Sequence, residues 1–101
     1  MKLLAEEEEM SQERMSRQAY VERVLELYRQ APETPARSSR LDRRLAGEFY
    51  DRQVRIEEVE TAILLTTARR LLRNPQAPKL GPIRSLQYFA PVIEEIKSTP
   101  I

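Results

Sequence analysis

Hydrophobic side chains recur with helical spacing in the first third of the chain. Between about Ser16 and Ala31 their spacing places them along one face of a helix: Tyr20, Val21, Val24, Leu25, Leu27 and Tyr28. Pro32 ends this predicted helix, because the residue before a proline avoids helical backbone angles. Residues 32–39, which include two prolines, are expected to form a stiff linker.

A second amphipathic helix is predicted to begin after Ser39 and to end near residues 51–53. Ser39 and Asp42 stand three positions apart, which is typical of a capping box at the start of a helix. Gly47 lies inside this helix, and the position suits either a close helix crossing or a tolerated surface glycine. Apolar side chains repeat every four residues and are expected to pack: Leu41, Leu45 and Phe49.

A third helix is predicted from about residue 56 to residue 73 and is expected to be central to the fold. Acidic residues occupy its first turns and arginines its last, an order that the helix dipole favours: Glu57, Glu58, Glu60, Arg69, Arg70 and Arg73. Its middle, TAILLTTA at residues 61–68, carries no charge on any face. Because a helix without a polar face is normally enclosed, this segment is expected to be buried on all sides.

The C-terminal segment, residues 82–97, is predicted to be a helix bent at a proline. Pro82 suits a first helical position. Pro91 has no N–H to donate to the carbonyl of Gln87, so it either kinks one helix or separates two. We expect a short turn of helix, a bend near Ala90 and then a second helical stretch. Apolar side chains with helical spacing would cover the central helix: Ile83, Leu86, Phe89 or Ala90, Ile93 and Ile96.

Together these patterns predict an all-α fold, a small bundle of about four helices in one domain spanning residues 16–101. The composition agrees, since 41% of the 101 residues are hydrophobic, 33% are charged and only two are glycine. Residues 1–15 lack a core pattern and are predicted to be a flexible acidic arm. The EEEE run at residues 6–9 is not expected to bind a cation, because consecutive carboxylates diverge.

The net charge of +1 conceals a basic middle. Residues 37–84 contain eleven basic and six acidic residues, a net charge of +5. Because arginine matches the geometry of phosphate groups, six arginines are candidate nucleic-acid-binding residues: Arg37, Arg40, Arg43, Arg44, Arg52 and Arg55. The alternative is an ordinary solvated face, in which Asp42, Glu48 and Asp51 balance these charges locally.

Apolar side chains of the first and last helices are candidates for an interface with a protein partner or a second copy of the chain. They are Tyr20, Leu27, Tyr88 and Val92. Tyr88 and Val92 lie off the line of core residues in the last helix, and whether they face a partner is left open by the sequence. The four tyrosines stand at helical spacing among aliphatic residues, which favours core packing over stacking on nucleic-acid bases.

Catalytic and metal-binding chemistry is not expected. The chain has no Cys and no His, which removes thiol nucleophiles, disulfides, imidazole bases and the usual zinc sites. Neighbouring carboxylates such as Glu94 and Glu95 diverge and cannot act as a catalytic pair. We therefore expect no enzyme activity, metal, cofactor or small-molecule substrate. Neither a secretory signal nor a membrane span is recognisable, so we expect a cytoplasmic protein of a bacterial-type cell.

Two stretches carry a resemblance, SRLDRRLAGEFYDRQVRIEEVETAILLTTARRLLRNP at residues 39–75 and PIRSLQYFAPVIEEI at residues 82–96. They resemble helical segments towards the C-termini of bacterial plasmid- and phage-type replication proteins and of proteins carried on mobile elements. The resemblance implies an accessory role near DNA replication or element maintenance. No phosphate loop is present, so autonomous initiator activity is not expected.

Two functional hypotheses follow. The first is a non-enzymatic helical module that associates with nucleic acid or with a replication or mobile-element complex and contacts phosphates through the six arginines. The alternative is a protein-interaction adaptor or homodimerising module without nucleic-acid contact. Salt dependence separates them, because phosphate binding weakens steeply with salt whereas an apolar interface barely responds.

Overall fold

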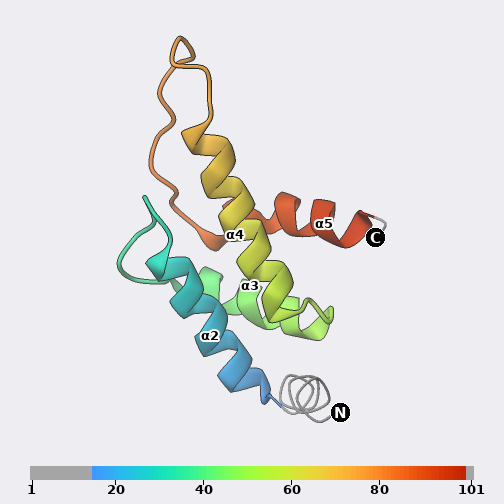
Figure 1. Ribbon diagram of the computed structural model, residues 1–101. Coiled ribbons are helices and arrows are strands. Elements are labelled where there is room, and N and C mark those ends of the chain that lie inside the picture. Colours follow the sequence, from blue (N-terminus) through green and yellow to red (C-terminus); the bar gives the residue numbers. More distant parts are fainter. Residues whose placement is uncertain (1–14, 100–101) are drawn as a thin grey trace, which may run out of the picture.

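The computed structural model describes residues 15–99, and no strand occurs in this range. The elements are α2 (Arg17–Gln30), α3 (Arg40–Asp51), α4 (Ile56–Leu71), the short 3-10 helix η1 (Leu86–Phe89) and α5 (Ala90–Ser98). The predicted all-α fold with about four helices is confirmed (Figure 1). The predicted N-terminal arm lies outside the described residues except for Met15, which packs against the core.

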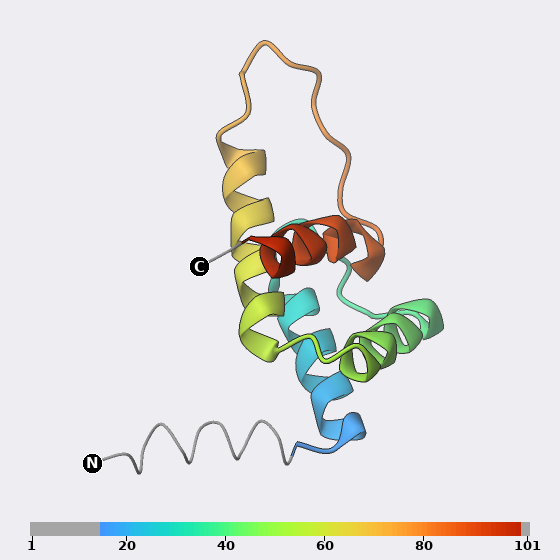
Figure 2. The ribbon, with the colours of Figure 1, turned by 90° about the vertical axis from the view of Figure 1, so that its right-hand side faces the viewer.

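The expected central helix, α4, links the first and last helices of the bundle. α4 packs against α2, α5 and η1, while α3 packs against α2 and η1. Figure 2 shows α5 crossing α4, and both views show the C-terminal end of α4 extending beyond the other helices. From that end, residues 72–85 form a long excursion that returns to η1.

The start of each long helix is fixed by local hydrogen bonds. The Ser16 hydroxyl accepts from the Ala19 N–H at 3.0 Å and caps α2. The predicted capping box of α3 is confirmed, since Ser39 and Asp42 exchange side-chain-to-backbone hydrogen bonds at 2.9 and 3.1 Å. At the start of α4, the Glu58 carboxylate accepts from the Arg55 N–H at 2.8 Å.

The core lies where the inner faces of the helices meet. The buried residues of the predicted stripe on α2 are confirmed, with Leu27 half-buried at its edge. Burying this apolar surface is the main stabilising contribution, at roughly 25 cal/mol per Å² removed from water. The buried hydrophobic residues are Tyr20, Val21, Val24, Leu25, Tyr28, Ala46, Phe49, Val54, Val59, Ala62, Ile63, Ile83, Leu86, Phe89 and Ile93.

The expectation that residues 61–68 are buried on all sides is wrong. One face of α4 is buried, at Val59, Ala62, Ile63 and Thr66, but Leu64 on the opposite face is 68% exposed. The helices within residues 15–99 cover only one side of α4. The face that carries Leu64 is therefore uncharged and open to solvent.

Leu41 was expected to pack beside Leu45 and Phe49, and this expectation is also wrong. Leu41 is 73% exposed, whereas Phe49 is buried and Leu45 half-buried. Leu41 stands in the first turn of α3, where Asp42 instead points into the protein and is only 3% exposed. The first turn of α3 is thus held by a hydrogen-bonded carboxylate rather than by an apolar contact.

The C-terminal segment combines one wrong and one confirmed prediction. Residues 82–85 are not helical, so Pro82 does not start a helix. The N–H of Ile83 donates to the carbonyl of Glu33 at 2.9 Å, which ties this segment to the loop after α2. The expected short turn followed by a second helix from Ala90 is confirmed, and Pro91 lies in the first turn of α5, where its missing N–H costs nothing.

Candidate interaction surfaces

Four of the six candidate arginines are ion-paired with carboxylates of the same chain. Arg43 pairs with Glu22 at 2.7 Å and Arg44 with Glu48 at 3.7 Å. The other two pairs are Arg52–Glu94 and Arg55–Glu57. All four arginine side chains are at least half exposed, so these pairs contribute little to stability, about 0–1 kcal/mol each. Their main effect is to neutralise positive charge locally.

Arg37 and Arg40 differ from the other candidates. Both are exposed, and neither has an ion-pair partner within residues 15–99. Arg37 precedes α3, and Arg40 is the first residue of that helix. Of the six candidate arginines, four are therefore ion-paired and two have no ion-pair partner among residues 15–99.

Tyr20, an expected interface residue, belongs to the core. It is only 4% exposed, and its hydroxyl donates to the Val54 carbonyl at 2.6 Å. Its ring packs edge-on against Tyr50 with 5.3 Å between centroids. Burial raises the pKa of the Tyr20 hydroxyl well above its ordinary value, and the charge of Glu58 adds to this shift. Tyr20 therefore cannot contact a partner without unfolding of the core.

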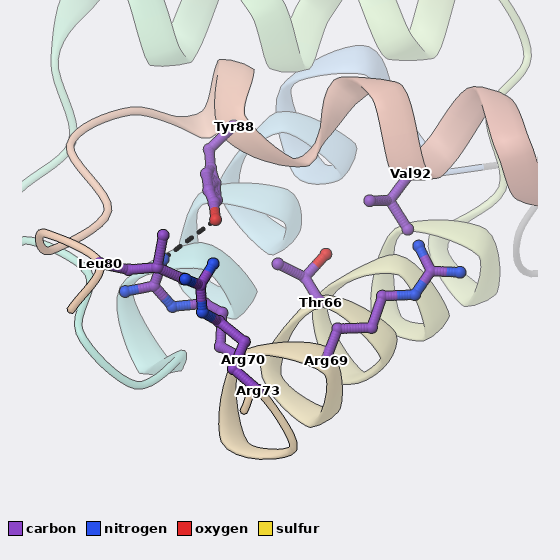
Figure 3. A pocket seen from close by; sticks show the side chains of 7 residues that line it. All are labelled: Thr66, Arg69, Arg70, Arg73, Leu80, Tyr88 and Val92. Carbon is purple, nitrogen blue, oxygen red and sulfur yellow. Dashed lines mark hydrogen bonds between the residues drawn. The ribbon is translucent and has the colours of Figure 1, made fainter. Parts of the chain in front are cut away.

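The remaining interface candidates are divided between two places. Leu27 is half-buried against the core at α2. Tyr88 and Val92 line the same hollow, of about 320 Å³, beside the last turns of α4 (Figure 3). The structure thus brings together two of the four side chains and separates the other two from them.

Arg70 holds the wall of this hollow in place. Its guanidinium donates to the Glu33 carboxylate at 2.7 and 3.0 Å, to the Tyr88 hydroxyl at 3.0 Å and to the Gly81 carbonyl at 2.8 Å. It also lies over the Tyr88 ring, 5.4 Å from the centroid. The hydrogen bonds with Glu33 and Tyr88 raise the pKa of Arg70. The Arg70 side chain is only 11% exposed. Its hydrogen bond to the Gly81 carbonyl attaches the 72–85 excursion to α4.

The outward face of α4 is a surface that the sequence analysis missed. Thr61, Leu64, Ala68 and Leu71 follow one another at intervals of three, four and three residues, which forms a straight seam along a helix. Leu64 and Leu71 are 68% and 79% exposed, and Leu72 beside them is 83% exposed. The spacing of this seam, opposite the buried residues of α4, is the signal that could have revealed it.

Searches for a metal site and for a membrane-spanning helix find neither in the described part of the chain. Among residues 15–99, no group of acidic side chains is arranged to hold a metal ion. No helix in this range is long and apolar enough to cross a membrane. Comparison with protein-family models, curated proteins and solved structures gives no match for this chain. Its own surfaces must therefore indicate its function.

Proposed function

We propose that this protein is a non-enzymatic, self-associating helical module, in which α4 packs against α4 of a second copy. The observation that carries the proposal is the exposed leucine seam on α4, with Leu64 and Leu71 68% and 79% exposed. Scattered apolar side chains are normal on protein surfaces, but a contiguous apolar face is typical of an interaction site.

An antiparallel arrangement of the two helices fits the side chains of the seam. When the pair is centred near residue 66, Leu64 faces Ala68 of the second copy and Thr61 faces Leu71. Each large side chain then meets a small one, which suits close packing of two helices. A parallel pair would instead set Ala68 against Ala68 and leave a gap.

Charge favours the same orientation. α4 carries Glu57 and Glu58 in its first turn and is followed at its other end by Arg73. Antiparallel packing places the acidic end of one helix beside the basic end of the other and aligns the helix dipoles favourably. Parallel packing would bring like charges together.

Oligomeric state as a function of concentration tests this function. A single helix pair is smaller than a standard interface of about 1,600 Å², so we expect a weak dimer that dissociates on dilution. Sedimentation equilibrium should show dimer for the wild type and for Leu41→Glu, and monomer for Leu64→Glu. Leu41 is the matched control because it is 73% exposed but lies on α3. A wild type that stays monomeric near millimolar concentration would exclude self-association.

Orientation can be tested with single cysteines, since the chain has none of its own. We expect an oxidised mixture of Thr61→Cys and Leu71→Cys chains to form the mixed disulfide in preference to either homodimer. A preference for Thr61→Cys homodimers would support parallel packing and contradict the proposed arrangement.

Association with nucleic acid is a second candidate, supported by the unmatched charges of Arg37 and Arg40. Phosphates could also replace the carboxylates of the neighbouring exposed ion pairs at little energetic cost. The resemblance to replication and mobile-element proteins favours this candidate. It requires no enzymatic residues and is compatible with a dimer.

A DNA-binding titration at two salt concentrations tests the second candidate. We expect duplex or single-stranded DNA to bind at low salt and to dissociate as salt rises, because binding releases counterions. Arg37→Ala/Arg40→Ala should weaken binding and reduce the salt dependence, whereas Arg23→Ala, whose charge is paired with Glu26 on α2, should not. Absence of binding at low salt would rule this candidate out.

A further inference from the structure

The hollow between the last turns of α4 and the segment that carries Leu80, Tyr88 and Val92 combines apolar walls with unmatched positive charge. We propose that it is a binding site for a small organic anion, a ligand with a carboxylate or phosphate group on an apolar body. This inference is independent of self-association, because the hollow and the leucine seam lie on opposite sides of α4. It departs from the expectation that the protein has no small-molecule ligand.

The apolar part of the site comes from three elements. Leu80 and Tyr88 are 40% and 37% exposed, and Val92 of α5 is half-buried. They surround a volume of about 320 Å³, which is at the lower end of the range for small-molecule sites. Figure 3 shows Tyr88 and Val92 on one side of the space, Thr66 between them, Arg70 and Arg73 near Leu80, and Arg69 reaching towards Val92. A phenyl ring or short aliphatic chain would fit there.

The positive charge along the edge is only partly balanced. Arg69 is paired with Glu95 through two hydrogen bonds at 2.9 and 2.5 Å, and Arg70 is paired with Glu33. Arg73 donates only to the Pro78 carbonyl, at 3.0 Å, and has no carboxylate partner within residues 15–99. It therefore retains an unmatched charge at the edge of the hollow, which favours an anionic ligand.

A second unmatched cation lines an adjoining hollow. An adjoining hollow of about 430 Å³ shares Arg70, Arg73 and Leu80 with the first and is also lined by Lys79. Lys79 is exposed and forms no ion pair within the described range. Arg73, which lines both hollows, and Lys79, which lines the adjoining one, supply two unmatched positive charges on this side of the site. The anionic group of the ligand is expected there and its apolar body towards Val92.

Tyr88 adds a directed hydrogen-bond donor. Its hydroxyl oxygen accepts from the Arg70 guanidinium at 3.0 Å, and its own proton has no acceptor among the described residues. Because Arg70 is also fixed by Glu33 and Gly81, the phenol is held in one orientation. An oxyanion in the hollow would accept the Tyr88 proton, in addition to its contacts with Arg73 and Lys79.

The test uses NMR titration of the full chain with four probes. We expect 3-phenylpropionate and phenyl phosphate to shift the methyl signals of Leu80 and Val92 in a saturable manner. Inorganic phosphate and the neutral 3-phenylpropanamide should bind at least about tenfold more weakly, because each lacks one half of the recognised chemistry. Equal affinity for the amide and the carboxylate would overturn the proposal. So would a titration in which other signals shift but the methyl signals of Leu80 and Val92 do not.

Variants test the assignment of the anion contacts. Arg73→Gln/Lys79→Gln should weaken 3-phenylpropionate binding by about tenfold or more, and Tyr88→Phe should weaken it by a smaller factor. The control Arg37→Gln/Arg40→Gln removes the same net charge from another surface and should leave affinity unchanged. If both double variants lost affinity equally, binding would reflect only the net charge of the protein, and the proposed site would be wrong.

Discussion

The carboxylate of Asp42 accepts a hydrogen bond from the backbone N–H of Leu86 at 2.9 Å, across 44 positions of the chain. Its other oxygen accepts from the N–H of Ser39 at 2.9 Å. Asp42 is only 3% exposed, so one buried side chain both caps α3 and anchors η1. It therefore links α3 to the C-terminal segment, in addition to apolar packing and the exposed Arg52–Glu94 ion pair between them.

Replacing Asp42 should therefore destabilise the protein strongly. Asp42→Ala leaves two backbone N–H groups without an acceptor, one of them buried, and should lower the free energy of unfolding by about 2–4 kcal/mol. Urea denaturation followed by circular dichroism measures the change. Asp51→Ala is the control, because the exposed pair of Asp51 with Arg17 is expected to contribute less than about 1 kcal/mol. Equal losses in both variants would show that the contact with Leu86 is unimportant.

Local signals explain why the three long helices could be predicted closely from the sequence. Pro32 stops α2, the Ser39–Asp42 box starts α3, and charge order marks the ends of α4. Each of these interactions acts within about one helical turn, so it can be recognised without knowledge of the tertiary structure. The bend before Pro91 was predictable for the same reason.

The surfaces were harder to predict because they depend on contacts between distant residues. An uncharged face on α4 is equally compatible with enclosure and with an open interface, and Leu64 proved to be exposed. The ion pair between Arg43 and Glu22 joins α3 to α2, and no spacing in the sequence predicts it. Ile83 is buried as expected, but its hydrogen bond to Glu33, rather than a helix, places it there.

Removing the hydroxyl group should change the stability of the protein differently at the two buried tyrosines, Tyr20 and Tyr28. Tyr20→Phe removes the hydrogen bond to Val54 and should cost about 1 kcal/mol. The Tyr28 hydroxyl is buried without a hydrogen-bond partner among the described residues, so Tyr28→Phe should be neutral or stabilising by up to about 1 kcal/mol. Thermal and urea denaturation of both variants test this. A loss in Tyr28→Phe as large as that in Tyr20→Phe would contradict it.

The same tyrosines should make the fold sensitive to alkali. Burial, aided by the charge of Asp42, raises the pKa of Tyr28 to about 12, and the pKa of Tyr20 is raised further. Below about pH 10 both states keep the phenol protons. Above it the unfolded chain loses them first, so stability should fall by about 1.4 kcal/mol per pH unit for each tyrosine, until the folded pKa is passed.

Urea denaturation between about pH 9 and pH 11.5 measures this fall. In Tyr28→Phe the free energy of unfolding should fall less steeply with pH, by the contribution of one tyrosine. Because both proteins contain the same lysines, comparing them at equal pH cancels the effect of lysine titration. Identical slopes for the wild type and Tyr28→Phe would mean that Tyr28 ionises as easily in the folded protein as in the unfolded chain.

Gly47 packs against the guanidinium of Arg17, and a Cβ atom at this position would lie 2.4 Å from Arg17 Nη2. The obstacle is the end of a flexible side chain, so Gly47→Ala should displace Arg17 and disrupt its exposed pair with Asp51. That loss is at most about 1 kcal/mol, whereas alanine gains up to about 1 kcal/mol in helix propensity. We expect nearly unchanged stability in urea denaturation. In an Arg17→Ala background the obstacle is absent, and Gly47→Ala should then stabilise by about 1 kcal/mol. Destabilisation in both backgrounds would show that helix backbones, not Arg17, limit this position.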